Sequence, residues 1–120
     1  MKYSEIKKLL QSITDPVEKL EMVMDFGKSL SPVPAGAKCS EILGCSSFVE
    51  ICRHGDKFYG RADSKLVAGI VALIMAMIDG KTIAEIKSMD IAQEISELNI
   101  NLGIARLGGV NSMASFFKNL

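Results

Sequence analysis

One uncharged run, Leu66–Ile78, constrains the fold more than any other feature of this sequence. A membrane-spanning helix needs about 20 apolar residues, and this run has 13. It is apolar nearly all round a helix, which predicts contact with neighbours on several sides. Ser64 precedes it as a suitable N-cap, and Asp79 with Gly80 ends it. We therefore expect a buried core helix within a single domain that spans residues 1–120.

Two helices are predicted before this core helix. Apolar residues recur at helical spacing in the first: Ile6, Leu9, Leu10 and Ile13. Asp15 followed by Pro16 supplies an N-cap and a first-turn proline for the second. The prolines in segment 31–34 remove backbone donors and favour extended backbone, so the second helix ends before them.

A small sheet is predicted in the middle of the chain. Phe48–Cys52 and Phe58–Arg61 are short β-prone runs, and the turn between them contains Gly55, which accepts a positive φ. We expect Glu41–Leu43 to add a third antiparallel strand. Thr82 and Asp90 begin two short helices, and Arg106–Gly109 is predicted as a loop before a last helix. The predicted fold class is α+β, with N-terminal and C-terminal helices flanking a three-stranded antiparallel sheet.

The charge balance excludes several classes of partner. Fourteen Lys and Arg face fourteen Asp and Glu, so the net charge is zero and no basic surface is expected for nucleic acid or anionic lipid. Charged residues in segment 1–8 occupy the place where a secretory signal has its apolar stretch. We expect a cytoplasmic protein without nucleic-acid or membrane partners.

The three cysteines, Cys39, Cys45 and Cys52, are the main candidates for chemistry. They cannot all pair within one chain, and in a reducing cytosol we expect them to remain thiols. Cys45 lies between Gly44 and Ser46, small residues that leave its sulfur uncrowded. On its predicted strand, Cys52 is interpreted as a small buried hydrophobe. Cys39 is interpreted as an inert thiol, a resolving thiol or a metal ligand.

A metal site is the main alternative. Cys39, Cys45, Cys52 and His54 offer enough soft ligands for zinc or an iron-sulfur cluster, although the C-x-x-C spacing is absent. His54 on its own is interpreted as a solvated turn residue, since no serine or carboxylate lies beside it in sequence as a catalytic partner. A third possibility is a plain interaction module, for which seven methionines are weak support.

Four segments together resemble one known family. They are segment 26–32, segment 44–49, segment 62–64 with segment 70–73, and segment 106–109 leading to Met113. In this order and at these spacings, the chain resembles the SufE/CsdE family of sulfur acceptors for cysteine desulfurases. The resemblance also implies a fold shared with IscU-like iron-sulfur scaffold proteins. The family usually has histidine before its Gly-Cys pair and glutamine after it, where this chain has Leu43 and Ser46.

The resemblance implies that Cys45 accepts sulfur as a persulfide from a cysteine desulfurase and passes it to an iron-sulfur scaffold. The protein would then be a carrier and activator without a cofactor of its own, because the pyridoxal phosphate belongs to the desulfurase. Asp63 and Arg106 match an aspartate and an arginine of the family, expected to position the Cys45 loop or to contact the desulfurase. The alternative is a purely structural role for each: Asp63 would cap a helix, and Arg106 would donate hydrogen bonds that stabilise a loop. We expect the resting Cys45 thiol in an apolar pocket, since a shielded persulfide is less easily reduced or oxidised.

Overall fold

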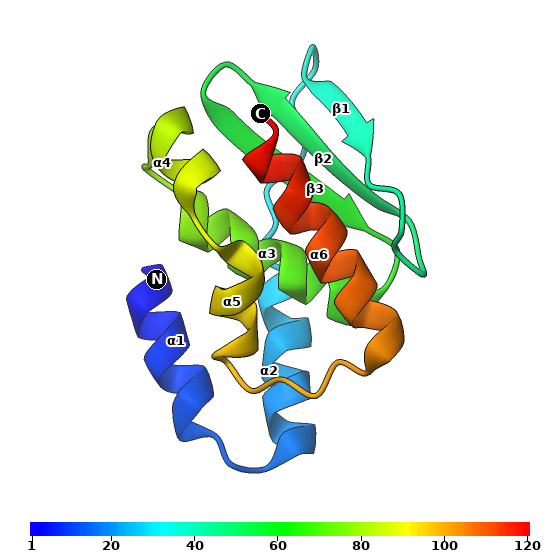
Figure 1. The fold of residues 1–120 in the computed structure, drawn as a ribbon. Helices are drawn as coiled ribbons and strands as arrows, with labels where there is room; N and C mark the ends of the chain where they lie inside the picture. Colours follow the sequence, from blue (N-terminus) through cyan, green and yellow to red (C-terminus); the bar gives the residue numbers. More distant parts are fainter.

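The computed structural model describes residues 1–103 and 106–120. Two helices come first, a sheet follows, and four helices complete the chain, as predicted (Figure 1). The elements in chain order are α1 (Tyr3–Ser12), α2 (Pro16–Gly27), β1 (Lys38–Glu41), β2 (Val49–His54), β3 (Lys57–Ala62), α3 (Lys65–Ile78), α4 (Ile83–Ser88), α5 (Ile91–Ser96) and α6 (Ile104–Lys118). The α+β class is therefore confirmed. None of the helices in the part of the chain that the structure describes is long and apolar enough to cross a membrane.

The sheet is antiparallel, in the order β1-β2-β3. A two-residue turn joins β2 to β3, and Gly55 has the predicted positive φ of 64° there. On β2, Val49 and Ile51 are buried and belong to the hydrophobic core. Because successive strand residues point to opposite faces, Glu50 and Cys52 lie on the other face of the sheet.

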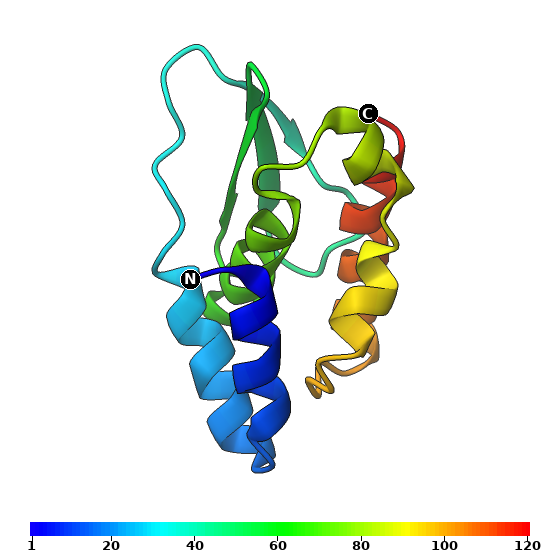
Figure 2. The ribbon, with the colours of Figure 1, turned by 90° about the vertical axis from the view of Figure 1, so that its left-hand side faces the viewer.

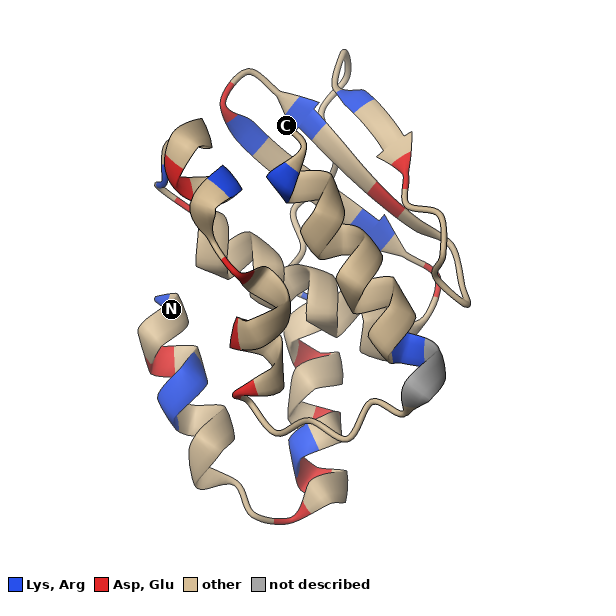
Figure 3. Ribbon diagram, in the orientation of Figure 1, with Lys and Arg blue, Asp and Glu red and all other residues tan. Residues whose placement is uncertain are grey.

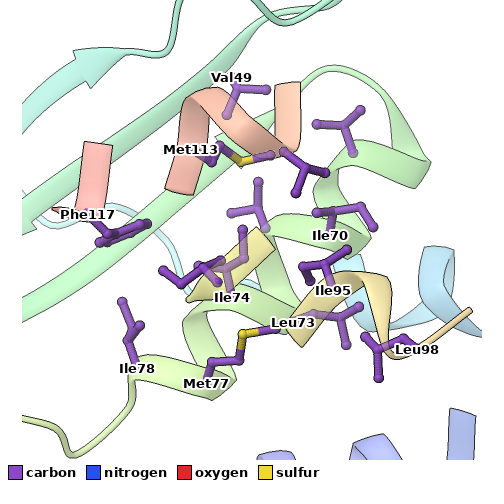
Figure 4. Close-up of a cluster of buried hydrophobic side chains, with 14 of the residues drawn as sticks. Val49, Ile70, Leu73, Ile74, Met77, Ile78, Ile95, Leu98, Met113 and Phe117 are labelled. Atoms are coloured by element: carbon purple, nitrogen blue, oxygen red, sulfur yellow. The ribbon is translucent and has the colours of Figure 1, made fainter. Parts of the chain in front are cut away.

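Helices cover one face of the sheet. Figures 1 and 2 show α6 on this side, whereas the connecting segment 28–37 runs along the opposite side. The close-up in Figure 4 shows side chains of β2, α3, α5 and α6 interlocking around Leu73 and Ile74. Phe117 of α6 also meets Phe58 of β3 edge to face, with ring centroids 5.5 Å apart. This core fixes the position of α6 relative to the sheet.

The capping predictions explain where several helices begin. Ser64 accepts a hydrogen bond from the Val67 amide at 3.4 Å, and Asp15 accepts one from the Val17 amide at 3.2 Å. Each bond satisfies an amide that has no partner within the first helical turn. The core helix therefore begins one residue before the predicted apolar run and ends with it at Ile78.

Two predicted boundaries are wrong. The first strand is Lys38–Glu41 rather than Glu41–Leu43, because β2 pairs with these earlier residues and Leu43 lies in the exposed loop beyond them. Segment 106–109 is not a loop, because α6 already includes it. Glycine inside a helix costs about 1 kcal/mol relative to alanine, so two consecutive glycines favoured the loop interpretation. The packing at the site described next explains why helical glycines occur here.

Candidate functional site at Cys45

Cys45 lies in the loop between β1 and β2 and is a free, partly buried cysteine. Its Sγ atom is 3.8 Å from the Gly109 carbonyl oxygen on α6, within reach of a weak S–H donor contact. These two residues are 64 positions apart in the sequence. The thiol therefore rests against α6 as a result of tertiary packing.

Three small residues of α6 make room for this loop, and we call them the α6 shelf: Gly108, Gly109 and Ser112. A Cβ atom on Gly109 would lie 3.1 Å from the Cys45 Sγ. A Cβ atom on Gly44 would lie 2.6 Å from the Ser112 Oγ, and the φ of Gly44 is 91°. The positive φ favours glycine at position 44, and a side chain there would also displace the Ser112 hydroxyl.

The Cys45 thiol borders a small, mainly apolar pocket between α3 and α6. The residues that line it with Cys45 are Ser46, Val67, Ile70, Arg106, Gly109, Val110 and Met113. Burial raises the pKa of Cys45 above its ordinary value, because the thiolate loses hydration there. The expected pocket is present, and it favours the protonated thiol at rest.

Of the site residues expected from the sequence, three lie close to Cys45: Gly44, Ser46 and Arg106. Gly44 and Ser46 flank Cys45 in the loop, and Arg106 lines the same pocket. The Arg106 Nη1 donates a hydrogen bond to the Leu102 carbonyl oxygen at 3.4 Å. This bond agrees with the purely structural role, in which Arg106 stabilises a loop.

Asp63 is not part of the pocket lining. Its backbone amide donates to the Phe48 carbonyl oxygen at 3.2 Å, which anchors the end of the Cys45 loop. Ser64, rather than Asp63, caps α3. Asp63 therefore contacts the loop through its backbone, at the start of α3.

The sequence did not predict the apolar part of the pocket lining, which is Val67, Ile70, Val110 and Met113, or the α6 shelf. The available signal was the Gly108-Gly109 pair next to an apolar helical pattern, which also fits a loop. Such a pair within a helix marks a place where another segment approaches the backbone closely. The sequence does not show which segment approaches.

Large apolar side chains near Cys45 are exposed. Leu43 and Phe48, from the same loop, are 77% and 36% exposed, and Leu107, in the first turns of α6, is 50% exposed. Exposed apolar side chains on the two segments that meet at Cys45 are candidates for contact with another protein. We call these three residues the Cys45 rim.

Cys39 and Cys52 form a disulfide, so the expectation that both remain free thiols is wrong. The register of β1 and β2 places them directly opposite each other, with Cα atoms 4.0 Å apart. Among the residues that the structure describes, the potential metal ligands that gather are Cys39, Glu50 and Cys52. The proposed set with Cys45 and His54 is not brought together, because His54 ends β2 and Cys45 packs on α6.

Comparisons with known proteins show which family the chain belongs to. Residues 4–120 match the model of the SufE family, described as an Fe-S metabolism associated domain. "Sulfur acceptor protein CsdE" of Escherichia coli (strain K12) is 26% identical over 111 residues, covering 85% of this chain and 76% of that protein. "Cysteine desulfuration protein SufE" of Wigglesworthia glossinidia brevipalpis is 27% identical over 110 residues, covering 84% and 76%.

A solved structure supports the fold independently. The solution structure of a hypothetical protein from Thermus thermophilus superposes with a TM-score of 0.77, covering 98% of this chain and 90% of that chain. Its sequence identity is 14%, so this likeness concerns the fold alone. The family match covers almost the whole chain, including the Cys45 loop and α6. The chain therefore belongs to the SufE family.

Proposed function

We propose that this protein accepts sulfur on Cys45 from a cysteine desulfurase, stimulates that enzyme, and delivers the sulfur to an iron-sulfur scaffold. The observation that carries the proposal is a single free thiol, held in a pocket by a glycine-containing loop, while the other two cysteines are bonded to each other. Membership of the SufE family and the names of the two relatives support the same activity.

The transfer is a thiolate displacement at sulfur. The Cys45 thiolate attacks the outer sulfur of a persulfide on the desulfurase, a new S–S bond forms on Cys45, and the donor sulfur leaves as a thiolate. One sulfur atom changes carrier and no external oxidant or reductant is needed. Removing the persulfide frees the desulfurase for another turnover, which explains the stimulation.

The resting pocket requires a movement of the loop before transfer. Burial raises the pKa of Cys45, so the protonated thiol in the pocket is a poor nucleophile. Leaving the pocket restores hydration to the sulfur and removes the cause of the raised pKa. Gly44, next to Cys45, is the position in the proposal about which the backbone turns, because glycine accepts both positive and negative φ values.

The Cys45 rim provides the docking surface in this proposal. Leu43 lies in the loop beside Gly44, Phe48 lies at the end that Asp63 anchors, and Leu107 lies on α6. Burial of these side chains against a desulfurase would stabilise the complex by about 25 cal/mol for each Å² of apolar surface removed from water. A desulfurase that buries more of this surface with the loop extended than with the loop at rest also favours exposure of the thiol.

A desulfurase turnover assay tests the proposal. Sulfide or alanine production is measured with the desulfurase alone and with added protein, in the presence of cysteine. We expect Cys45→Ser to reduce stimulation to the level of the desulfurase alone. The matched control is the double variant Cys39→Ser/Cys52→Ser, which removes two sulfurs and is expected to keep stimulation. Stimulation retained by a folded Cys45→Ser variant would reject the proposal.

A further inference from the structure

A second group of reactive side chains lies on the sheet face that points away from the core. Residues two apart on a strand share a face, so Cys39 and Glu41 of β1 lie beside Cys52 and Glu50 of β2. The register pairs Cys39 with Cys52 and Glu41 with Glu50. We call these four residues the Cys–Glu quartet. None of them has a role in the proposed sulfur transfer at Cys45.

The spacing within the quartet suits a metal ion. The sulfur atoms of Cys39 and Cys52 and a carboxylate oxygen of Glu50 all lie within 4.8 Å of one another. The Cys52 Sγ is 3.6 Å from the Glu50 Oε1. In a tetrahedral zinc site with Zn–S bonds of about 2.3 Å, two thiolates lie roughly 3.8 Å apart. Zinc ligation therefore requires the S–S bond to open and the two sulfur atoms to move apart to this distance.

The charges around the quartet also favour a cation. Glu41 and Glu50 face each other across the strands, a like-charge pair that destabilises a sheet. Arg61 of β3 binds Glu50 through its Nε at 3.0 Å and its Nη2 at 2.6 Å, both to Oε1. Figure 3 shows this row of acidic positions on β1 and β2 beside a basic position on β3. A cation near both carboxylates would relieve the remaining repulsion.

We propose that the reduced form of this protein binds one Zn²⁺ ion through Cys39, Cys52 and Glu50. Three protein ligands leave the fourth tetrahedral position for water, on the side of the exposed Cys39. Two thiolates and one carboxylate carry three negative charges, which Zn²⁺ and Arg61 together neutralise. Arg61 acts as an outer partner that orients the ligating carboxylate.

The redox state of the cysteines controls this site. A dithiol reductant exchanges with the Cys39–Cys52 disulfide and transfers two electrons and two protons, leaving two thiols and the oxidised reductant. Binding of Zn²⁺ then releases the two thiol protons to solvent. Oxidation to the disulfide removes both sulfur ligands and releases the ion.

A zinc-binding measurement on the Cys45→Ser variant tests the proposal without the third thiol. The protein is reduced, freed from reductant without oxygen, and titrated with Zn²⁺ in competition with a chromogenic chelator. Thiol counting in the same sample confirms two free thiols. We expect one Zn²⁺ per chain in the reduced protein and none in the oxidised protein. Absence of stoichiometric binding in the reduced, folded protein would overturn the proposal.

Single substitutions identify the ligands. Since Cys52 is fully buried, Cys39→Ser at the exposed strand is the primary thiol variant, and we expect it to abolish stoichiometric binding. We expect Glu50→Gln to weaken Zn²⁺ binding at least tenfold and Glu41→Gln, its cross-strand control, to weaken it less than threefold. Cd²⁺ gives a second readout, because thiolate ligation produces a sulfur-to-metal absorption band. Equal affinities in Cys39→Ser, Glu50→Gln and the parent would assign the ion to other residues.

Because these measurements omit Cys45, they are separate from the desulfurase assay. Failure of zinc binding leaves sulfur acceptance unaffected, and loss of stimulation in Cys45→Ser leaves the quartet unaffected.

Discussion

Two regions of this molecule hold cysteine sulfur in different ways. Cys45 is held by non-covalent packing, in a loop that rests on the small residues of α6. Cys39 and Cys52 are held by strand pairing, opposite each other on β1 and β2. The first arrangement joins distant parts of the chain without a covalent bond, and the second closes a short loop covalently. Only the first leaves a thiol free to move.

The comparison indicates which region tolerates change. A residue held by packing can leave its pocket at the cost of a few weak contacts, as a carrier requires. A disulfide between paired strands restricts the same sheet from which the Cys45 loop extends. The sheet therefore serves as a rigid base for the movable loop, and the predictions below separate the two properties.

The largest expected effect on stability comes from removing the disulfide. Cys39 and Cys52 are 13 residues apart, and closing a loop of this size stabilises a protein by about 3 kcal/mol in the chain-entropy model. We expect Cys39→Ser/Cys52→Ser to lower the free energy of unfolding by up to that amount, measured by urea titration. The alkylation rate of Cys45 should stay within twofold of the parent, and a larger change would show that the two regions are coupled.

The next effect concerns Gly44. Gly44→Ala places a side chain at a φ of 91° and a Cβ 2.6 Å from the Ser112 Oγ. Gly36 has a similar φ of 84° with nothing within 4 Å of the position that a Cβ would take, so Gly36→Ala is the matched control. We expect both to lose about 1–2 kcal/mol of stability from backbone strain.

Gly44→Ala should lose more stability than its control and should also speed the alkylation of Cys45, because the loop must shift from α6. Ser112→Ala removes the opposing oxygen and is expected to reverse part of both effects. Identical behaviour of the Gly44→Ala and Gly36→Ala variants would contradict the role of the α6 shelf.

A smaller effect on stability, with a clear effect on reactivity, is expected at the shelf itself. Gly109→Ala places a Cβ 3.1 Å from the Cys45 Sγ, whereas Gly108→Ala meets only the Gly44 carbonyl oxygen at 3.7 Å. Alanine favours the helix by about 1 kcal/mol, which offsets the crowding. We expect Gly109→Ala to raise the Cys45 alkylation rate several-fold and Gly108→Ala to leave it nearly unchanged. The reverse order would contradict the described packing.

The smallest expected effect is on the pH dependence of Cys45 alkylation. Burial raises the pKa of Cys45, so the thiolate fraction at neutral pH is lower than for an exposed thiol. The pKa of an exposed cysteine is about 8.5, and we expect the alkylation midpoint of Cys45 to lie above this value. Gly109→Ala should lower the midpoint toward that of an exposed thiol. A parent midpoint below about 8.5 would show that a positive group, rather than burial, controls the resting thiol.

Local patterns were sufficient for much of the fold. The core helix ends at Ile78 as the apolar run predicts, and the Ser64 cap and the Gly55 turn are present. These features depend on residues close in sequence, where hydrophobic periodicity and capping act directly. The importance of Cys45 was also predicted, from its small neighbours and from the family resemblance.

Features that depend on register and tertiary contact were not predicted. The predicted first strand, Glu41–Leu43, does not include Cys39. The pairing of Cys39 with Cys52 therefore could not be predicted from it. A shift of strand boundaries by a few residues costs little in local propensity but changes every cross-strand partner. The helical Gly108-Gly109 pair was likewise interpreted from its intrinsic preference, because the loop that packs against it is distant in sequence.

The most direct test of the account locates the transferred sulfur. The protein is mixed with a cysteine desulfurase and cysteine, digested without reductant, and its peptides are measured by mass spectrometry. The account predicts an added sulfur atom on the Cys45 peptide, with the Cys39 and Cys52 peptides still linked by their disulfide. Added sulfur on Cys39 or Cys52, or none on an alkylatable Cys45, would contradict it.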